Sequence, residues 1–243
     1  MSLENAFVLG AEGAAIGSDA TCERLATVVM RLVQAGKRVV LFAGPTRERA
    51  EQLRRDASRL PGTADAWDRA AVLARGSFES AERISWWLSE HGVVSTVIED
   101  TAELPVGRGC PNEAEPRRVS ARRISKAFEE ASVVIIPGGV AQDGTGRVMS
   151  LGSGGTALSA VFAGDRLALP VRVLGSESNW EGDEYDGAMP AGLPRRAALL
   201  ARDSQVSVFA AEDASVLLPA AGGRTGRNPG FAVRANVRFA TSA

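Results

Sequence analysis

Histidine and lysine are scarce in this chain of 243 residues, which has one histidine and only two lysines among its 28 basic residues. A metal–histidine site or a Ser-His-Asp triad would have to use His91. His91 follows an expected helix and precedes Gly92, a position that favours a helix C-cap over catalysis. Any lysine-dependent step has only Lys37 and Lys126 available.

Cysteine pairs, charge imbalance and long apolar runs are also lacking. Cys22 and Cys110 stand far apart without CxxC spacing, which excludes a disulfide framework and a cysteine zinc site. The net charge of -1 gives no electrostatic argument for nucleic acid or an anionic membrane as a partner. No apolar run reaches the roughly 18 residues of a transmembrane helix, and the first residues lack a secretory signal pattern. We therefore expect a cytoplasmic, enzyme-like protein with a small-molecule ligand.

The sequence does contain alternating apolar runs and amphipathic stretches. Apolar or β-branched runs predict strands at residues 6–9, 39–42, 93–98, 133–136, 166–174, 206–209 and 231–239. Helical spacing predicts helices at residues 21–35, 46–60, 64–75, 78–90, 119–131, 195–202 and 212–221. The charged residues of the helix at 46–60 are expected on a solvated face. Residues 175–194 are expected to be a loop, and residues 101–116 a loop or a lid. The pattern predicts one α/β domain over residues 1–243, a three-layer α/β/α sandwich with a mostly parallel central sheet.

The stretch at residues 132–163, SVVIIPGGVAQDGTGRVMSLGSGGTALSAVFA, organises the rest of the chain. It predicts a buried strand closed by a PGG turn, a β-hairpin at 140–149, a glycine loop at 151–155, and a helix at 156–163 with Thr156 as N-cap. Glycines let the backbone approach a ligand closely, and the unsatisfied first N–H groups of a helix favour an anion such as phosphate. A glycine turn between strand and helix is also an ordinary connection, so spacing alone leaves both interpretations open.

This stretch resembles the aspartokinase branch of the amino-acid kinase family. The family carries a strand ending in a TGF-like turn, an acidic hairpin ending in Gly-Arg, and an LGRGGSD loop before a TA-rich helix. Here PGG at 137–139, Gly146-Arg147 and LGSGGTA at 151–157 fall on these positions. The resemblance continues in order along nearly the whole chain. It implies the amino-acid kinase fold, with ATP and Mg²⁺ as cofactors if the protein is a kinase, and we expect no ACT regulatory domain.

The same resemblance implies the site residues. Nucleotide or phosphate contacts fall on Gly10, Gly13, Gly152, Gly154, Gly155 and Asp186, and substrate contacts on Glu82, Arg83, Ser153 and Thr156. Glu82 matches the glutamate that holds the substrate's amino group in the family's S-x-G-E-R-x-S helix. From the residues alone, Glu82 and Arg83 could equally be surface charges. No metal ligand is assigned, because the acidic residues between 177 and 186 are more typical of a solvated loop.

The chain departs from the family pattern at its charged positions. Gly10 stands at the place of the phosphate-contacting lysine, Ser153 at the loop arginine, Ala157 at the loop aspartate and Ser215 at a second lysine. Phosphoryl transfer depends mainly on such positioned charges. We therefore expect ordinary L-aspartate 4-phosphorylation to be absent or very slow.

Two functions remain open from the sequence. In the favoured one, the domain binds a small carboxylate or amino-acid-like molecule, and phosphoryl transfer is altered or lost, so that it is a pseudokinase or serves another reaction in a specialised pathway. In the alternative, it is an active ATP-dependent carboxylate kinase that forms an acyl phosphate. Arg47, Arg83 and Arg147 are then the arginines nearest to predicted strand ends that could replace the lysines.

Adjacent tryptophans predict a contact between subunits. Neighbouring helical residues point about 100° apart, so one helix face cannot bury both Trp86 and Trp87. Aromatic residues are enriched in interfaces, and amino-acid kinases commonly pair through helices of this region. We expect a homodimer with one tryptophan, preferably Trp87, at or near the interface. The alternative is that another helix of the same chain covers it.

Overall fold

A seven-stranded sheet forms the centre of the computed structural model, which describes residues 3, 5–175, 196–197, 206–210 and 233–234. The strand order is β11-β10-β9-β1-β2-β6-β3. The strands are β1 (Ala6–Ala11), β2 (Arg38–Ala43), β3 (Ser95–Val97), β6 (Val133–Pro137), β9 (Val171–Gly175), β10 (Val206–Ala210) and β11 (Val233–Arg234). All neighbouring pairs are parallel except β10 with β11, which confirms the predicted mostly parallel sheet. The carboxyl ends of β1, β2 and β6 are in register, so they share one edge of the sheet.

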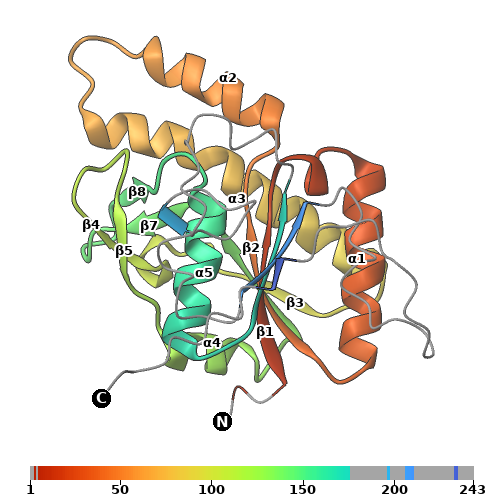
Figure 1. Cartoon of the computed structure of the whole chain (residues 1–243). Coiled ribbons are helices and arrows are strands. Elements are labelled where there is room, and N and C mark those ends of the chain that lie inside the picture. The colour runs from red at the N-terminus through yellow and green to blue at the C-terminus, as the bar shows by residue number, and fades with distance from the viewer. Residues whose placement is uncertain (1–2, 4, 176–195, 198–205, 211–232, 235–243) are drawn as a thin grey trace.

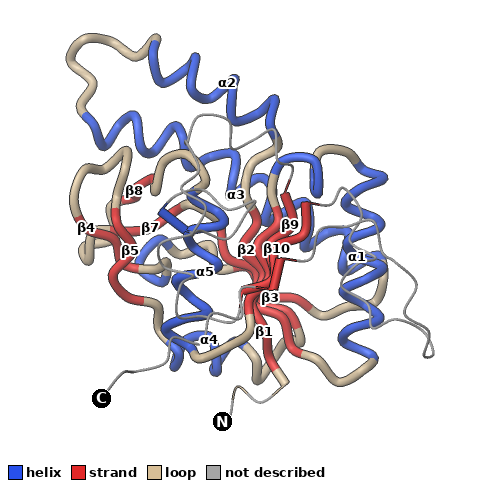
Figure 2. The backbone as a smooth tube through the Cα atoms, in the orientation of Figure 1, coloured by secondary structure: helices blue, strands red, loops and turns tan. Residues whose placement is uncertain are grey.

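Helices cover both faces of this sheet (Figures 1 and 2). On one face, α1 (Asp19–Gln34) and the second half of α3 (Ala66–Glu90) pack against the strands. On the other face, α4 (Ala121–Ala127) and α5 (Gly155–Leu167) do so. Successive side chains of β1 alternate between the two cores, as the pleat of a strand requires. The predicted three-layer α/β/α sandwich is confirmed.

The local sequence explains where α1 lies. Ser18 and Thr21 form a capping box at its start, just after a short 3-10 turn, η1 (Gly13–Ile16). Leu25 and Val29 recur at helical spacing and are fully buried against the sheet. Burying such a side chain contributes about 1.5–3 kcal/mol, so this stripe fixes the helix on its face of the sheet.

Helix α3 is continuous, which corrects the prediction of two helices at 64–75 and 78–90. Gly76 lies between the predicted halves and faces α2 (Arg47–Ser58). A Cβ at Gly76 would lie 2.9 Å from the Cβ of Pro45 and 3.0 Å from Cδ1 of Leu53. A glycine inside a helix costs about 0.5–1 kcal/mol relative to alanine. Here it lets α2 pack closely on α3, and that contact offsets the cost.

The C-terminal end of α3 orients the two tryptophans. His91 is the C-cap residue, as predicted, and its ring nitrogens contact Thr27 Oγ1 at 3.1 Å and the carbonyl of Trp87 at 2.8 Å. Trp87 packs against the core shared by α1 and the sheet. Trp86 is 55% exposed, and Val94, just beyond the helix, is 63% exposed. Trp86 is therefore the outward residue, contrary to the preference for Trp87.

A second, smaller sheet lies beside the first, in the order β5-β4-β7-β8. Its strands are β4 (Val106–Arg108), β5 (Glu115–Arg118), β7 (Val140–Gln142) and β8 (Val148–Ser150). The hairpin expected at 140–149 is confirmed as β7 and β8. The expected loop at 101–116 instead contains η2 (Thr101–Glu103), β4 and the start of β5. Strands this short depend on pairing across the sheet, and periodicity does not reveal them.

Several predicted boundaries shift. The strand expected at 166–174 is β9, which begins at Val171, because α5 continues to Leu167 and ends at Ala168 in a left-handed conformation. The helix expected at 119–131 is the shorter α4. Arg196 and Ala197 are helical, within the expected helix at 195–202, and β10 matches its prediction. The acidic loop with Asp186 and the helix expected at 212–221 lie outside the described residues.

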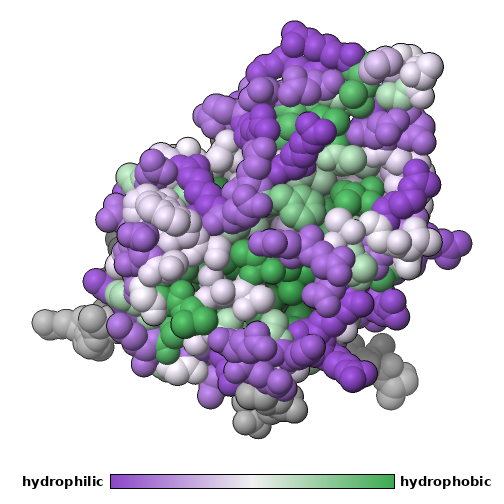
Figure 3. Space-filling view, turned by 180° about the vertical axis from the view of Figure 1, so that it is seen from behind, coloured by the Kyte–Doolittle hydropathy of each residue, from purple (hydrophilic) through white to green (hydrophobic). Residues whose placement is uncertain are grey.

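The surface on the far side from Figure 1 is mainly hydrophilic, with apolar residues in separate patches (Figure 3). Among the helices that the structure describes, none has the length and apolar character to cross a membrane.

Candidate functional site

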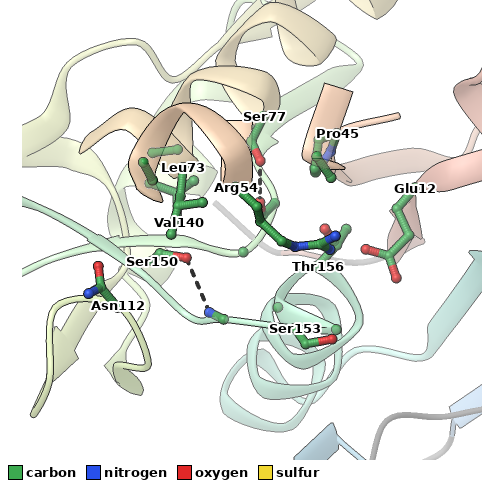
Figure 4. A pocket seen from close by; sticks show the side chains of 18 of the residues that line it. Glu12, Pro45, Arg54, Leu73, Ser77, Asn112, Val140, Ser150, Ser153 and Thr156 are labelled. Atoms are coloured by element: carbon green, nitrogen blue, oxygen red, sulfur yellow. Dashed lines mark hydrogen bonds between the residues drawn. The ribbon is translucent and has the colours of Figure 1, made fainter. Parts of the chain in front are cut away.

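A cavity of about 750 Å³ lies at the carboxyl edge of the central sheet. Its floor is formed by the residues that follow β1, β2 and β6, and the first turn of α5 closes one side. The paired helices α2 and α3 close the other side, with the residues just before β5 at the end (Figure 4). In parallel α/β sheets, ligands bind at the carboxyl ends of the strands, and this volume suits a small molecule or cofactor.

The glycine loop enters this cavity as predicted. Gly154 is the N-cap of α5, in the left-handed region at φ 66°, and no side chain caps the helix. Gly139, in the turn after β6, also has a positive φ of 72° and lies against Gly155. A Cβ at Gly139 would lie 3.2 Å from the carbonyl carbon of Gly155, and a Cβ at Gly155 would lie 2.9 Å from Cα of Gly139, so a side chain at either would push the turn and the helix apart. The close approach sets the start of α5 on the cavity wall, where its first N–H groups and dipole favour an anion.

Thr156 is not the N-cap that the sequence predicted. Because Gly154 adopts the left-handed conformation, the helix begins earlier, and Thr156 lies within its first turn, 2% exposed. Its side chain fills the space left by two glycines. A Cβ at Gly44 would lie 2.2 Å from Thr156 Oγ1, and one at Gly138 would lie 2.6 Å from Thr156 Cγ2. Thr156 therefore packs α5 onto the ends of β2 and β6, at the wall of the cavity.

The other expected phosphate contacts separate into two groups. Gly13, Gly152, Gly154 and Gly155 line the cavity, as does Ser153, an expected substrate contact, which lies exposed on the rim. Gly10 lies within β1 and is not among the lining residues. A Cβ there would come 3.0 Å from the Cβ of Ala160, so Gly10 allows α5 to pack on the strand. The position that carries the family's lysine thus faces a helix in this chain.

Glu82 and Arg83, the expected substrate contacts on α3, lie outside the cavity. Glu82 is exposed, and Arg83 donates to Asp19 at 2.7 Å on the side of α1. The α3 residue that faces the cavity in this region is Ser77, whose Oγ donates to the carbonyl of Gly138 at 2.7 Å. Ser77 and Glu82 are five residues apart and so point about 140° away from each other on a helix.

Sequence reasoning missed two of the cavity's arginines, Arg54 and Arg69. Residues of α2 line it at helical spacing, although the pattern was interpreted as a solvated face: Arg47, Ala50, Glu51, Arg54, Ala57 and Ser58. Arg47 forms an ion pair with Glu51 at 3.2 Å. Arg54, and Arg69 from α3, have no hydrogen-bond acceptor or carboxylate partner in the described part of the chain. The helical spacing of Arg47, Arg54 and Ser58 indicates that they share one face of α2. Only the position of α3 shows that this face turns toward the cavity.

Two further polar groups complete the lining. Glu12, directly after β1, is only 8% exposed and lines the cavity near Gly13. Figure 4 shows Arg54 reaching across the cavity over Thr156, with the Glu12 carboxylate beyond it. Asn112 Oδ1 is buried and receives no hydrogen bond from the residues that the structure describes. The inner cavity therefore presents a cation, a carboxylate and an amide.

The arginines suggested by the sequence as lysine replacements have other contacts. Arg83 pairs with Asp19, and Arg147 stacks on the ring of Trp67, 4.0 Å from its centroid. Of those arginines, Arg47 alone lines the cavity, and Glu51 neutralises it.

A mostly parallel sheet with a glycine-lined cavity at its carboxyl edge is typical of α/β domains that bind small ligands. The model of the amino acid kinase family matches residues 5–170, and the chain belongs to this family.

Solved structures agree with this assignment at the level of the fold. E. coli aspartokinase III in complex with aspartate and ADP has a TM-score of 0.67 and 16% identity, covering 84% of this chain and 61% of its own. Aspartate kinase from Synechocystis has a TM-score of 0.65 and 18% identity, covering 84% and 37%. Isopentenyl phosphate kinase has a TM-score of 0.57 and 13% identity, covering 86% and 93%. The match thus spans less than two thirds of either aspartokinase. A search of the curated proteins found no match.

Proposed function

We propose that this amino-acid kinase family domain binds a small carboxylate or amino-acid-like molecule in the cavity, and that phosphoryl transfer is altered or lost. The glycine loop, the cavity and the uncapped start of α5 support the ligand site. The positions at which the family carries charged residues support the change in phosphoryl transfer. Gly10 packs on Ala160, Ser153 lies on the rim, and Ala157 is fully buried in the core rather than in the cavity.

The observation that carries the proposal is Glu12. It lies two residues after Gly10, the position of the family's phosphate-contacting lysine, and it is almost buried at the cavity wall. Like charges at short range repel strongly where water is excluded. A polyphosphate in the cavity would approach this carboxylate, and Gly10 supplies no lysine to attract the phosphate in compensation. Glu12 therefore disfavours ATP at the place where the family binds phosphate.

The test is a kinase assay with trapping. The protein is incubated with ATP, Mg²⁺, hydroxylamine and a panel of amino acids and carboxylic acids, and both hydroxamate and ADP are measured. We expect neither product above the protein-free control. An aspartokinase turnover in the usual range of about 1–100 s⁻¹ would refute the proposal.

The alternative is an active ATP-dependent carboxylate kinase, and one observation favours it. Arg54 and Arg69 are cations of the cavity without partners among the described residues, and they could neutralise phosphate oxygens. No group of three or more His, Cys, Asp or Glu side chains is placed to hold a metal in the described part of the chain. Mg²⁺ in kinases commonly uses one or two carboxylates together with substrate phosphates, so Glu12 or Glu113 could contribute. Micromolar binding of ATP by calorimetry would favour this alternative.

We also propose that the protein acts in the cytoplasm as a homodimer, on a small molecule rather than on nucleic acid. The exposed Trp86 and Val94 support a contact between subunits. They lie at the end of α3 and just before β3, one of the two edge strands of the described sheet. A second copy covering this edge would remove both side chains from water.

A further inference from the structure

Two opposite charges face the inner cavity, and neither lies at a position that the family motifs assign to the substrate. Arg54 comes from α2 and Glu12 from the end of β1. In Figure 4 the Arg54 side chain extends over Thr156, and the Glu12 carboxylate lies beyond it. The first turn of α5 is therefore bracketed by a cation and an anion.

Arg54 differs from the other arginines of its helix. Arg47 is paired with Glu51, and Arg49 donates to both carboxylate oxygens of Glu79, at 2.7 Å and 2.5 Å. Arg54 turns toward the cavity and has no acceptor among the described residues. A guanidinium presents five donors in a planar fork that matches a carboxylate or phosphate. The first residues of α5 line the same cavity without a side-chain cap, and the N-terminal end of a helix favours an anion, so one acidic group could contact both.

Glu12 supplies the opposite charge. It is 8% exposed and interacts within the protein, yet it remains part of the cavity wall. A carboxylate in this position attracts an ammonium group and repels a second acidic group. The pair therefore distinguishes ligands by where their charges lie.

We propose that Arg54 and Glu12 are the residues that select the ligand of this cavity, a small zwitterion. Its acidic group lies between Arg54 and the start of α5, and its ammonium group lies toward Glu12. The inference rests on the proposed function, because it requires that the cavity bind a small acid. Under this proposal, charge recognition depends on Arg54 of α2 and Glu12 after β1. In the family pattern it depends on the loop arginine and the α3 glutamate.

The test uses matched probe pairs that differ by one ammonium group: L-aspartate with succinate, and L-glutamate with glutarate. Calorimetric titration of the wild-type chain should show tighter binding of at least one amino acid than of its deaminated partner. Arg54→Gln should weaken both members of that pair by about 10- to 100-fold, because a charge-assisted bidentate contact is lost. Glu12→Gln should weaken the amino acid alone and abolish the preference, whereas Glu12→Asp should keep it.

The matched control is Arg55→Gln. Arg54 and Arg55 are neighbouring, exposed arginines of α2, but only Arg54 lines the cavity. Circular dichroism and thermal melting establish that each variant is folded. Equal affinities of Arg54→Gln and Arg55→Gln overturn the role of Arg54 while the proposed function stands. A preference that persists in Glu12→Gln overturns the role of Glu12 in the same way. A wild-type chain that binds none of the four acids refutes the proposed function and this inference together.

Discussion

Gly44 and Gly138 leave room for one side chain, that of Thr156, and this fit holds α5 against the sheet edge. Gly44→Ala would place a methyl group 2.2 Å from Thr156 Oγ1 and 2.8 Å from the Cβ of Glu12. We expect a loss of about 1–3 kcal/mol in the free energy of unfolding, measured by urea denaturation. The control is Gly62→Ala, where no heavy atom lies within 4 Å of the new methyl group. A Gly44→Ala protein as stable as the control would contradict the packing described.

The two cysteines should differ in reactivity. Burial raises the pKa of the Cys22 thiol, an effect that nearby Arg83 partly opposes, whereas Cys110 is exposed. Thiolate is the reactive form, so a disulfide reagent at pH 8 should modify one thiol rapidly and the second only after unfolding. The Cys110→Ser variant should lose the fast phase. Rapid labelling of Cys22 in the folded protein would contradict its burial between α1 and the sheet.

Among the elements, the hairpin of β7 and β8 provides a test of pH dependence. Hydrogen bonds from the Thr145 side chain and amide, with further help from Arg147, lower the pKa of Asp143. A lowered pKa in the folded state means that the carboxylate stabilises the turn above its unfolded value of about 3.9. This stabilisation is lost as the pH falls through the folded pKa.

We therefore expect wild type to be more stable than Asp143→Asn at neutral pH, and the difference to vanish at the acidic end of a series of thermal melts. If the stability advantage of wild type over Asp143→Asn instead grew as the pH fell, the proposed role of the Asp143 carboxylate would be contradicted.

The elements also show what the sequence can and cannot predict. Strands such as β1, β2 and β6 were predictable because both faces are buried and their apolar runs are uninterrupted. The glycine loop was predictable because its backbone conformations require glycine. The charged face of α2 was misinterpreted, because periodicity identifies a polar face but not whether it meets water or a cavity. The break expected near Gly76 failed because close packing of α2, a tertiary contact, decides that position.

At the scale of the whole molecule, the exposed Trp86 and Val94 beside β3 predict a homodimer. Light scattering at micromolar concentration should give the mass of a dimer for wild type. Trp86→Glu should shift the mass toward that of the monomer, because it places a charge where an apolar contact is expected. Arg55→Glu, on α2, serves as the control and should remain dimeric. A wild-type protein at the monomer mass would contradict the proposed contact.

The central claim for the whole molecule is that a kinase-type cavity now recognises a small acid without productive use of ATP. Calorimetric titration of the full chain with ATP and Mg²⁺ tests it most directly. Because Glu12 lies where phosphate would approach and no lysine lies within the described cavity, the account predicts no binding at millimolar nucleotide. Micromolar binding of ATP, accompanied by ADP formation when an acid is added, would contradict it.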